Sequence, residues 1–170
     1  MVATERLSYE DVEGADELFT PGFVEYLVEL HDKFIAQVRE LREKRAVVLR
    51  RALKQGIMRA HLPTSDINTS DWQVPLVPAE LRRPGIEITG PASITSMFIN
   101  ALNPGPDGTR AVGDLDDDED AGGHRFVDTV TAAGNRLAAV NRTLEFTNDA
   151  TGRHYSIKDG EIPFFMHRER

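Results

Sequence analysis

The residues best suited to chemistry stand together in one short run, Asp114–Asp120 (DLDDDED), in which six of seven side chains are acidic. Crowded carboxylates repel one another, and they gain stability when they share a divalent cation or a proton. The run begins where a predicted strand ends, which is where α/β folds carry their active-site groups. A solvated acidic loop is the alternative interpretation, and composition alone favours it.

Other patterns that could carry chemistry are weaker. An EF-hand is disfavoured, because Glu119 stands where the loop needs glycine and Arg125 where it needs a bidentate glutamate. The chain has no cysteine, which excludes disulfides, thiolate metal sites and cysteine nucleophiles. No H-x-x-x-H pair occurs among the histidines, which are His31, His61, His124, His154 and His167. Because His167 and Arg168 are neighbours at the end of the last predicted strand, one of the two can face a site.

Alternating strands and helices over residues 85–170 must position the acidic run. The predicted strands are 85–89, 110–115 and 163–167, the predicted helices are 94–102 and 126–140, and a hairpin is predicted from 144–147 and 154–157. This order predicts an α/β fold of parallel βα units. Parallel strands need cover on both faces and neighbours on both edges. We therefore expect the N-terminal helix or another chain to complete the sheet.

The first half of the chain divides into three parts. Residues 1–19 are polar and are predicted to be a flexible N-terminus. Residues 20–56 are predicted to be a helical extension, which begins at an N-cap threonine followed by proline, carries one apolar stripe and ends at Gly56. Residues 57–84 contain four prolines and no clear period, so they predict an extended connector to the domain at 85–170.

Charge and hydropathy exclude several classes of partner. The 170 residues carry 20 Lys and Arg against 28 Asp and Glu, a net charge of −8. This sign argues against binding to the phosphate backbone of nucleic acids. No apolar run approaches the roughly 20 residues that span a bilayer, and the acidic N-terminus has no signal-peptide core. We expect a cytoplasmic protein that does not associate with membranes.

Several motifs, in order along the chain, resemble the malate synthase family, malate synthase A in particular. The acidic stretch 117–121 (DDEDA) is similar to the family's D-F-E-D-A, with Asp118 in place of the aromatic residue. Residues 168–170 (RER) are similar to the R-x-R at the end of the third barrel strand. Further matches are 71–74 (DWQV), 86–91 (IEITGP) and 97–103 (MFINALN). The resemblance covers about residues 20–170. It implies an N-terminal helical part followed by about three βα strands of a TIM (β/α)8-type barrel, a partial barrel that another chain would complete.

The resemblance also implies a reaction. In malate synthases an aspartate base removes a proton from the methyl group of acetyl-CoA, and the enolate attacks glyoxylate in the presence of Mg²⁺. Arg168 matches the arginine that stabilises the developing oxyanion. Glu119 and Asp120 keep the family's identities, so they are expected near the metal, whereas its direct ligands and the base lie in the part of the family that this chain does not match. The additional acids Asp114, Asp116 and Asp118 have no family counterpart.

Three hypotheses follow. The open sheet edge after residues 163–167 favours a split enzyme, in which this chain is the N-terminal subunit and a complementary C-terminal barrel subunit supplies the rest. That heteromer would condense an acyl thioester, either acyl-CoA or an acyl-carrier thioester, with a 2-oxo acid such as glyoxylate. The alternative is a non-catalytic or degenerate module for binding or scaffolding. A third hypothesis is a cation-binding protein built on the acidic run.

Overall fold

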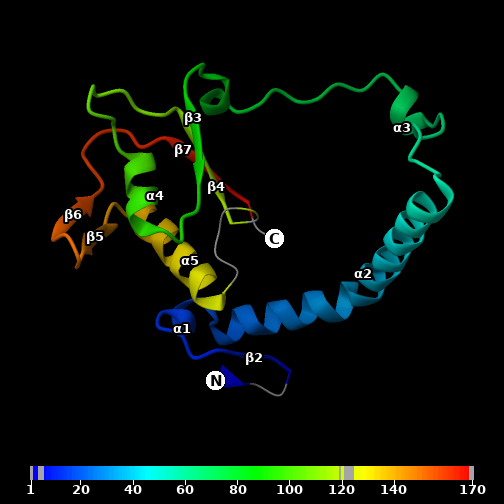
Figure 1. Ribbon diagram of the computed structural model, residues 1–170, viewed down its shortest axis with the longest axis horizontal. Coiled ribbons are helices and arrows are strands. Elements are labelled where there is room, and N and C mark those ends of the chain that lie inside the picture. The colour runs from blue at the N-terminus through cyan, green and yellow to red at the C-terminus, as the bar shows by residue number, and fades with distance from the viewer. Residues whose placement is uncertain (1, 4–5, 119, 121–124, 169–170) are drawn as a thin grey trace. The chain divides into compact units, whose positions relative to one another are not determined.

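The chain folds as two units, and only one of them contains the parallel sheet. The computed structural model describes residues 2–3, 6–118, 120 and 125–168 (Figure 1). One unit comprises residues 1–20 and 77–170, and the other comprises residues 21–76. Within the described part of the chain, no helix combines the length and the apolar character needed to cross a membrane.

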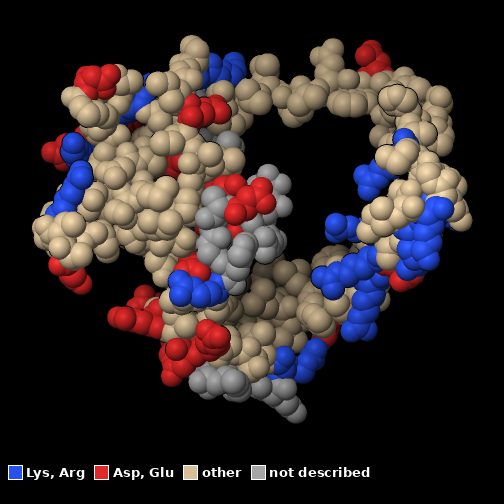
Figure 2. All heavy atoms as spheres, viewed as in Figure 1, with Lys and Arg blue, Asp and Glu red and all other residues tan. Residues whose placement is uncertain are grey.

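The unit of residues 21–76 is built on one long helix. Helix α2 (Pro21–Gln55) runs without interruption for 35 residues. Its lysines and arginines are visible as an extended blue region in Figure 2. No residue of α2 is buried, and apolar side chains such as Phe34 and Leu41 are 41 % and 60 % exposed. The following connector contains only the short helix α3 (Asp66–Thr69). Within this unit, no other element covers the apolar stripe of α2.

The other unit is organised around a three-stranded parallel sheet. Strands β3 (Glu87–Gly90), β4 (Gly113–Asp117) and β7 (Phe164–Arg168) lie in the order β3-β4-β7. Residues Thr89, Leu115 and Met166 lie side by side across the three strands. The predicted parallel arrangement is confirmed. The central strand differs from the prediction of 110–115, because β4 continues to residue 117 and so includes much of the acidic run.

Two helices connect these strands and lie on the same side of the sheet (Figure 1). Helix α4 (Thr95–Leu102) follows β3, and helix α5 (Phe126–Val140) follows β4. The Asp128 carboxylate accepts a hydrogen bond from the Arg125 backbone N–H at 3.2 Å, and it places negative charge in the first turn of α5. The buried apolar core is formed by Ala92, Phe98, Ile99, Leu102, Ala132, Ala139 and Leu144. This core joins both helices to the hairpin that follows α5.

That hairpin consists of β5 (Glu145–Asn148) and β6 (Arg153–Ser156), which pair antiparallel as predicted. At its turn the Asn148 side-chain oxygen accepts hydrogen bonds from two backbone N–H groups, those of Ala150 and Thr151, at 3.0 and 3.1 Å. Gly152 closes the turn with a φ of 66°, a conformation that favours glycine. The turn chemistry therefore fixes the hairpin register locally.

The N-terminal segment of this unit packs on the start of α5. It contains β1 (Val2–Ala3), β2 (Ser8–Tyr9) and α1 (Ala15–Leu18). The rings of Tyr9, Phe19 and Phe126 form a cluster with centroid distances of 4.8 to 5.5 Å. A short 3-10 helix, η1 (Ala79–Arg82), precedes β3. The aromatic cluster joins residues more than 100 positions apart, so no local pattern in the sequence indicates it.

Candidate functional site

Strand β4 presents its acidic residues on alternating faces of the sheet. Asp114 and Asp116 are 2 % and 0 % exposed, whereas Gly113, Leu115 and Asp117 are half-buried. This alternation is the side-chain period of a strand. Because Asp116 contacts α5, Asp114 lies on the same helix-covered face. The sequence predicts that the run passes from the strand end at residue 115 into a loop, whereas the strand continues to residue 117 and Asp114 and Asp116 are buried.

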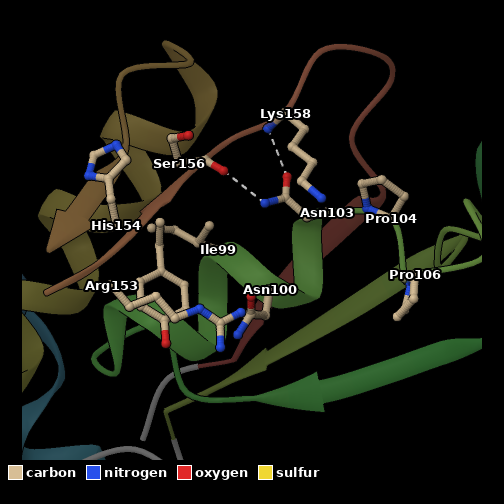
Figure 3. A pocket seen from close by; sticks show the side chains of 11 residues that line it. Ile99, Asn100, Asn103, Pro104, Pro106, Arg153, His154, Ser156 and Lys158 are labelled. Carbon is tan, nitrogen blue, oxygen red and sulfur yellow. Dashed lines mark hydrogen bonds between the residues drawn. The ribbon is translucent and has the colours of Figure 1, made fainter. Parts of the chain in front are cut away.

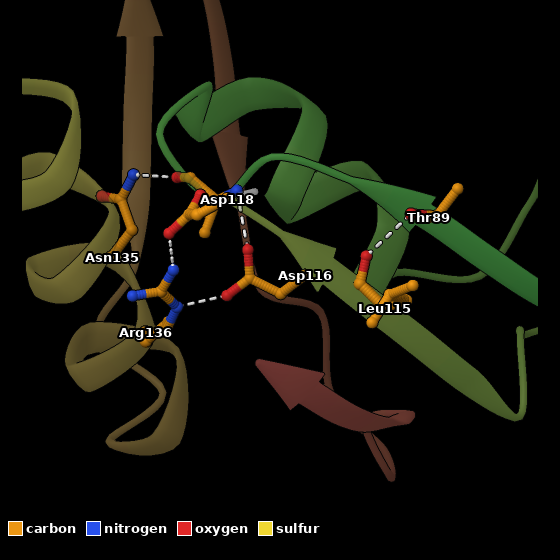
Figure 4. Close-up of polar contacts among 7 residues, drawn as sticks. Thr89, Leu115, Asp116, Asp118, Asn135 and Arg136 are labelled. Carbon is orange, nitrogen blue, oxygen red and sulfur yellow. Dashed lines mark hydrogen bonds and ion pairs between the residues drawn. The ribbon is translucent and has the colours of Figure 1, made fainter. Parts of the chain in front are cut away.

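On that face the Asp116 carboxylate is held by a backbone N–H and by an arginine side chain (Figure 4). One carboxylate oxygen accepts a hydrogen bond from the Ala92 backbone N–H at 2.9 Å, and the other pairs with Nε of Arg136. The Nη2 atom of Arg136 pairs with the Asp118 carboxylate. One guanidinium therefore bridges two carboxylates, and all three side chains are at most 13 % exposed. Arginine suits this role because its planar fork presents several donors in fixed directions.

A neighbouring residue of α5 completes the attachment between helix and sheet. The Asn135 amide donates hydrogen bonds to the Ala92 backbone oxygen at 2.7 Å and to the Thr95 hydroxyl at 3.0 Å. Asn135 therefore holds the segment that connects β3 to α4, whereas Arg136 pairs with acids of β4 and the residue that follows it. In the sheet itself, the Thr89 hydroxyl donates to the Leu115 backbone oxygen at 3.0 Å (Figure 4).

Asp114 lacks the compensation that Asp116 receives. Its Oδ1 atom is buried and has no hydrogen-bond partner among the described residues, and the same holds for Oδ1 of Asp118. Burial, together with the neighbouring negative charge of Asp116, raises the pKa of Asp114 to about 6. The Arg136 guanidinium pairs with Asp116 and Asp118, so it offsets two of the three carboxylates on this face.

The described residues do not fit a magnesium site. No group of three or more His, Asp or Glu side chains in the described ranges could hold a metal ion. Mg²⁺ requires oxygen ligands in near-octahedral positions. The carboxylates of Asp116 and Asp118 instead pair with Arg136. Asp120 is exposed, and its N–H donates to the Asp117 carboxylate at 3.1 Å. Glu119, the other predicted neighbour of the metal, lies outside the described residues.

Arg168 ends β7, and the structure describes its backbone only. The register pairs Arg168 with Asp117 across β7 and β4, and His167 with Asp116. The carboxyl ends of both strands therefore lie at one edge of the sheet, and Asp120 follows two residues beyond Asp118. The predicted site residues 120 and 168 consequently belong to neighbouring strand ends, although no side-chain contact between them is described.

Arg136 is the residue that sequence reasoning missed. Alternating acids on a strand under a helix require a cation from that helix, and α5 contains only one lysine or arginine, which is Arg136. That pairing could have been inferred once the strand was extended to residue 117. The predicted loop after residue 115 concealed it.

The similarity to malate synthases predicted from the motifs is confirmed by comparison with known proteins. The chain is 32 % identical to malate synthase of Myxococcus xanthus over 151 residues, which cover 88 % of this chain and 26 % of that protein. It is 32 % identical to malate synthase A of Escherichia coli over 162 residues, which cover 91 % of this chain and 28 % of that protein. Glyoxysomal malate synthase of Zea mays is 29 % identical over 88 % of the chain. No protein-family model matches. The chain thus spans about a quarter of the length of these relatives.

Proposed function

From this similarity we propose that the chain is the N-terminal subunit of a split malate-synthase-like enzyme. It would supply the helical part and the first three strands, β3, β4 and β7, of a TIM-type barrel. A complementary subunit would supply the remaining strands, the base and the metal ligands. The heteromer would condense an acyl thioester with a 2-oxo acid such as glyoxylate.

The observation that carries this proposal is the shared edge of β4 and β7. Parallel strands present their carboxyl ends together, and barrel enzymes place catalytic groups at those ends. Here the backbone of Arg168 lies in register with Asp117, at the start of the stretch that resembles the family's acidic motif. A guanidinium at this edge would stabilise negative charge that develops on the oxygen of the 2-oxo acid during carbon–carbon bond formation.

The exposed surface of the first strand supports completion by further polypeptide. Strands β3 and β7 are the outer strands of the described sheet. Ile86, which precedes β3, is 64 % exposed, and Ile88, within β3, is 42 % exposed. Parallel strands are normally buried on both faces and paired on both edges, so an exposed apolar parallel strand is unfavourable. Additional strands would bury this surface.

The experiment is reconstitution. The chain is co-expressed with a polypeptide that carries the remaining three quarters of a malate-synthase-like sequence, preferably the neighbouring reading frame. We expect a stable heteromer that releases coenzyme A from acetyl-CoA only when a 2-oxo acid is present. Arg168→Ala should reduce turnover about 100-fold or more without dissociating the complex. Arg39→Ala on exposed α2 is the matched control and should leave turnover unchanged.

A second candidate is a non-catalytic binding or scaffold module. One observation favours it: the acids Asp116 and Asp118 are occupied by Arg136 rather than open to a ligand. This candidate predicts the same heteromer without coenzyme A release. It also predicts that Arg168→Ala changes neither the complex nor its affinity, so the reconstituted activity separates the two functions.

A further inference from the structure

A cavity lies at the opposite end of the strands from Arg168. It has a volume of about 500 Å³, is open to solvent and lies between the C-terminal end of α4, the loop that leads to β4 and the β5–β6 hairpin (Figure 3). We call it the hairpin pocket and define it by the lining residues Asn100, Asn103, Pro104, Arg153, Tyr155 and Lys158. Its volume falls within the range of small-molecule sites.

The hairpin pocket is lined by basic side chains, although the chain as a whole is acidic. The chain carries a net charge of −8, yet none of the described residues lining this pocket is acidic, whereas Arg153 and Lys158 are basic. No ion pair joins either side chain to a carboxylate of the described residues. His154 also lines the pocket, but its ring nitrogens face Thr147 and Glu145. Two cations are therefore available to an anionic ligand.

Asp107, which follows the lining residue Pro106, is engaged elsewhere. The two carboxylate oxygens of Asp107 accept hydrogen bonds from the N–H and the hydroxyl of Thr109, each at 3.0 Å. These bonds close the loop before β4 on itself. Asp107 is thus satisfied by its own turn and does not neutralise the two cations.

The walls of the pocket are tied together by hydrogen bonds. The Asn103 amide donates to the Ser156 backbone oxygen and accepts from the Lys158 backbone N–H, both at 2.8 Å (Figure 3). The Arg110 guanidinium donates hydrogen bonds to two backbone oxygens, that of Leu102 at 3.0 Å and that of Asp159 at 2.6 Å. These contacts fix the end of α4 against the segment that leaves the hairpin. A site with fixed walls loses less entropy on binding than one that must be ordered.

The side chains supply both charge and an apolar surface. The Arg153 guanidinium lies 4.7 Å from the centre of the Tyr155 ring, a stacked position that leaves its N–H edges available. Asn100 on α4 and Asn103, the C-cap of this helix, contribute amide groups, and Pro104 contributes an apolar wall (Figure 3). Guanidinium and ammonium groups beside neutral amides are typical of oxyanion recognition.

We propose that the hairpin pocket binds a small organic anion, whose phosphate or carboxylate group is held by Arg153 and Lys158. The organic part would lie against the apolar wall. This site is separate from the edge at Arg168 and does not depend on the function proposed above.

The test is titration of the ¹⁵N-labelled full chain at about 0.15 M salt, where weak surface attraction is largely screened. Inorganic phosphate and succinate are the two probes, and they distinguish a phosphate site from a carboxylate site. We expect saturable shifts of the Asn100, Arg153 and Lys158 resonances with a dissociation constant of roughly 1 mM or below for one of the probes. Arg153→Gln/Lys158→Gln should weaken this binding about tenfold or more.

The matched control is Arg39→Gln/Arg42→Gln, which removes the same charge from exposed positions on α2. It should bind the probe with unchanged affinity. If the pocket double variant fails to fold, the single variants Arg153→Lys and Lys158→Gln replace it, and each should weaken binding. The proposal is overturned if neither probe gives saturable shifts, or if the control weakens binding as much as the pocket variants do.

Discussion

Arg136 is the residue on which the helix-covered face of β4 depends. It neutralises Asp116 and Asp118, which are 0 % and 13 % exposed at their side chains. An acid left in such a position without its cation is strongly unfavourable, whereas a well-packed apolar replacement of the whole group is tolerated. The ion pairs of Arg136 with Asp116 and Asp118 therefore fix the position of α5 on the sheet more than they add to the net free energy of unfolding.

Removal of this cation gives the first prediction. Arg136→Leu should lower the free energy of unfolding by about 3–5 kcal/mol, because two buried carboxylates lose their partner. Urea denaturation monitored by circular dichroism measures this change. Arg136→Leu combined with Asp116→Ala and Asp118→Leu should recover most of the loss. Equal destabilisation by the single and triple variants would contradict the assignment.

Asp114 gives a prediction with a defined pH dependence. The pKa of about 6 in the folded chain lies above the ordinary value for an aspartate, so ionisation opposes folding. The penalty is absent below about pH 4, grows up to about pH 6 and is complete above it. Asp114→Asn should therefore stabilise the chain by roughly 2 kcal/mol at pH 7.5 and have little effect near pH 4.

Asp107 provides the control of opposite sign. Hydrogen bonds from the backbone and the hydroxyl of Thr109 lower the pKa of Asp107, so its ionised form favours folding. Asp107→Asn should lose stability at neutral pH, and the loss should diminish as the pH falls below the ordinary aspartate range. Denaturation curves at about pH 2.5, pH 4 and pH 7.5 compare both variants. Parallel pH profiles for the two would refute the account of Asp114.

At the scale of elements, the face that α5 buries was predicted only in part. The apolar spacing of Phe126, Val130, Ala133, Leu137 and Val140 predicts that these residues share the buried face of the helix. The structure buries Val130 with Ala132 and Ala139, and it leaves Leu137 and Val140 59 % and 63 % exposed. The buried row 132, 135, 136 and 139 includes polar residues that contact the sheet and the β3–α4 connection. Apolar periodicity cannot detect a helix face that buries satisfied polar groups.

The link between α4 and the hairpin gives a prediction at the same scale. Asn103 is the C-cap of α4, and its side chain bonds to the backbone of Ser156 at the end of β6 and of Lys158 just beyond it. Asn103→Ala should lower the free energy of unfolding by about 1 kcal/mol, because two exposed backbone groups exchange their amide partner for water. It should also accelerate amide exchange at Lys158. Asn100→Ala, one turn earlier on α4, is the control and should change neither quantity appreciably.

At the scale of the whole molecule, many large apolar side chains remain exposed, both on α2 and near the three-stranded parallel sheet. Eight of the exposed large hydrophobic residues lie on α2, and Ile86 and Ile88 lie beside and within β3. Contiguous exposed apolar surface marks contact with other polypeptide in soluble proteins. The coverage of about a quarter of each relative agrees with this feature.

Assembly gives the corresponding prediction. Ile88→Lys places a charge on the exposed part of β3 and should abolish formation of the reconstituted heteromer while changing the stability of the chain alone by less than about 1 kcal/mol. Size-exclusion chromatography with light scattering measures the complex. Thr129→Lys, an exposed position on α5, introduces the same charge and should leave assembly intact. A heteromer that forms normally with Ile88→Lys would exclude β3 from the contact.

The sequence by itself determined the order of elements, the parallel βα units, the hairpin and the similarity to malate synthases, because these depend on local periodicity, turn residues and motifs along the chain. Tertiary structure alone decided that Asp114 and Asp116 are buried, that Arg136 neutralises the acidic face and that Arg153 and Lys158 border one cavity. Each of these features joins side chains from separate elements. Their energies depend on burial and on partners brought close by folding, and no spacing in the sequence encodes either quantity.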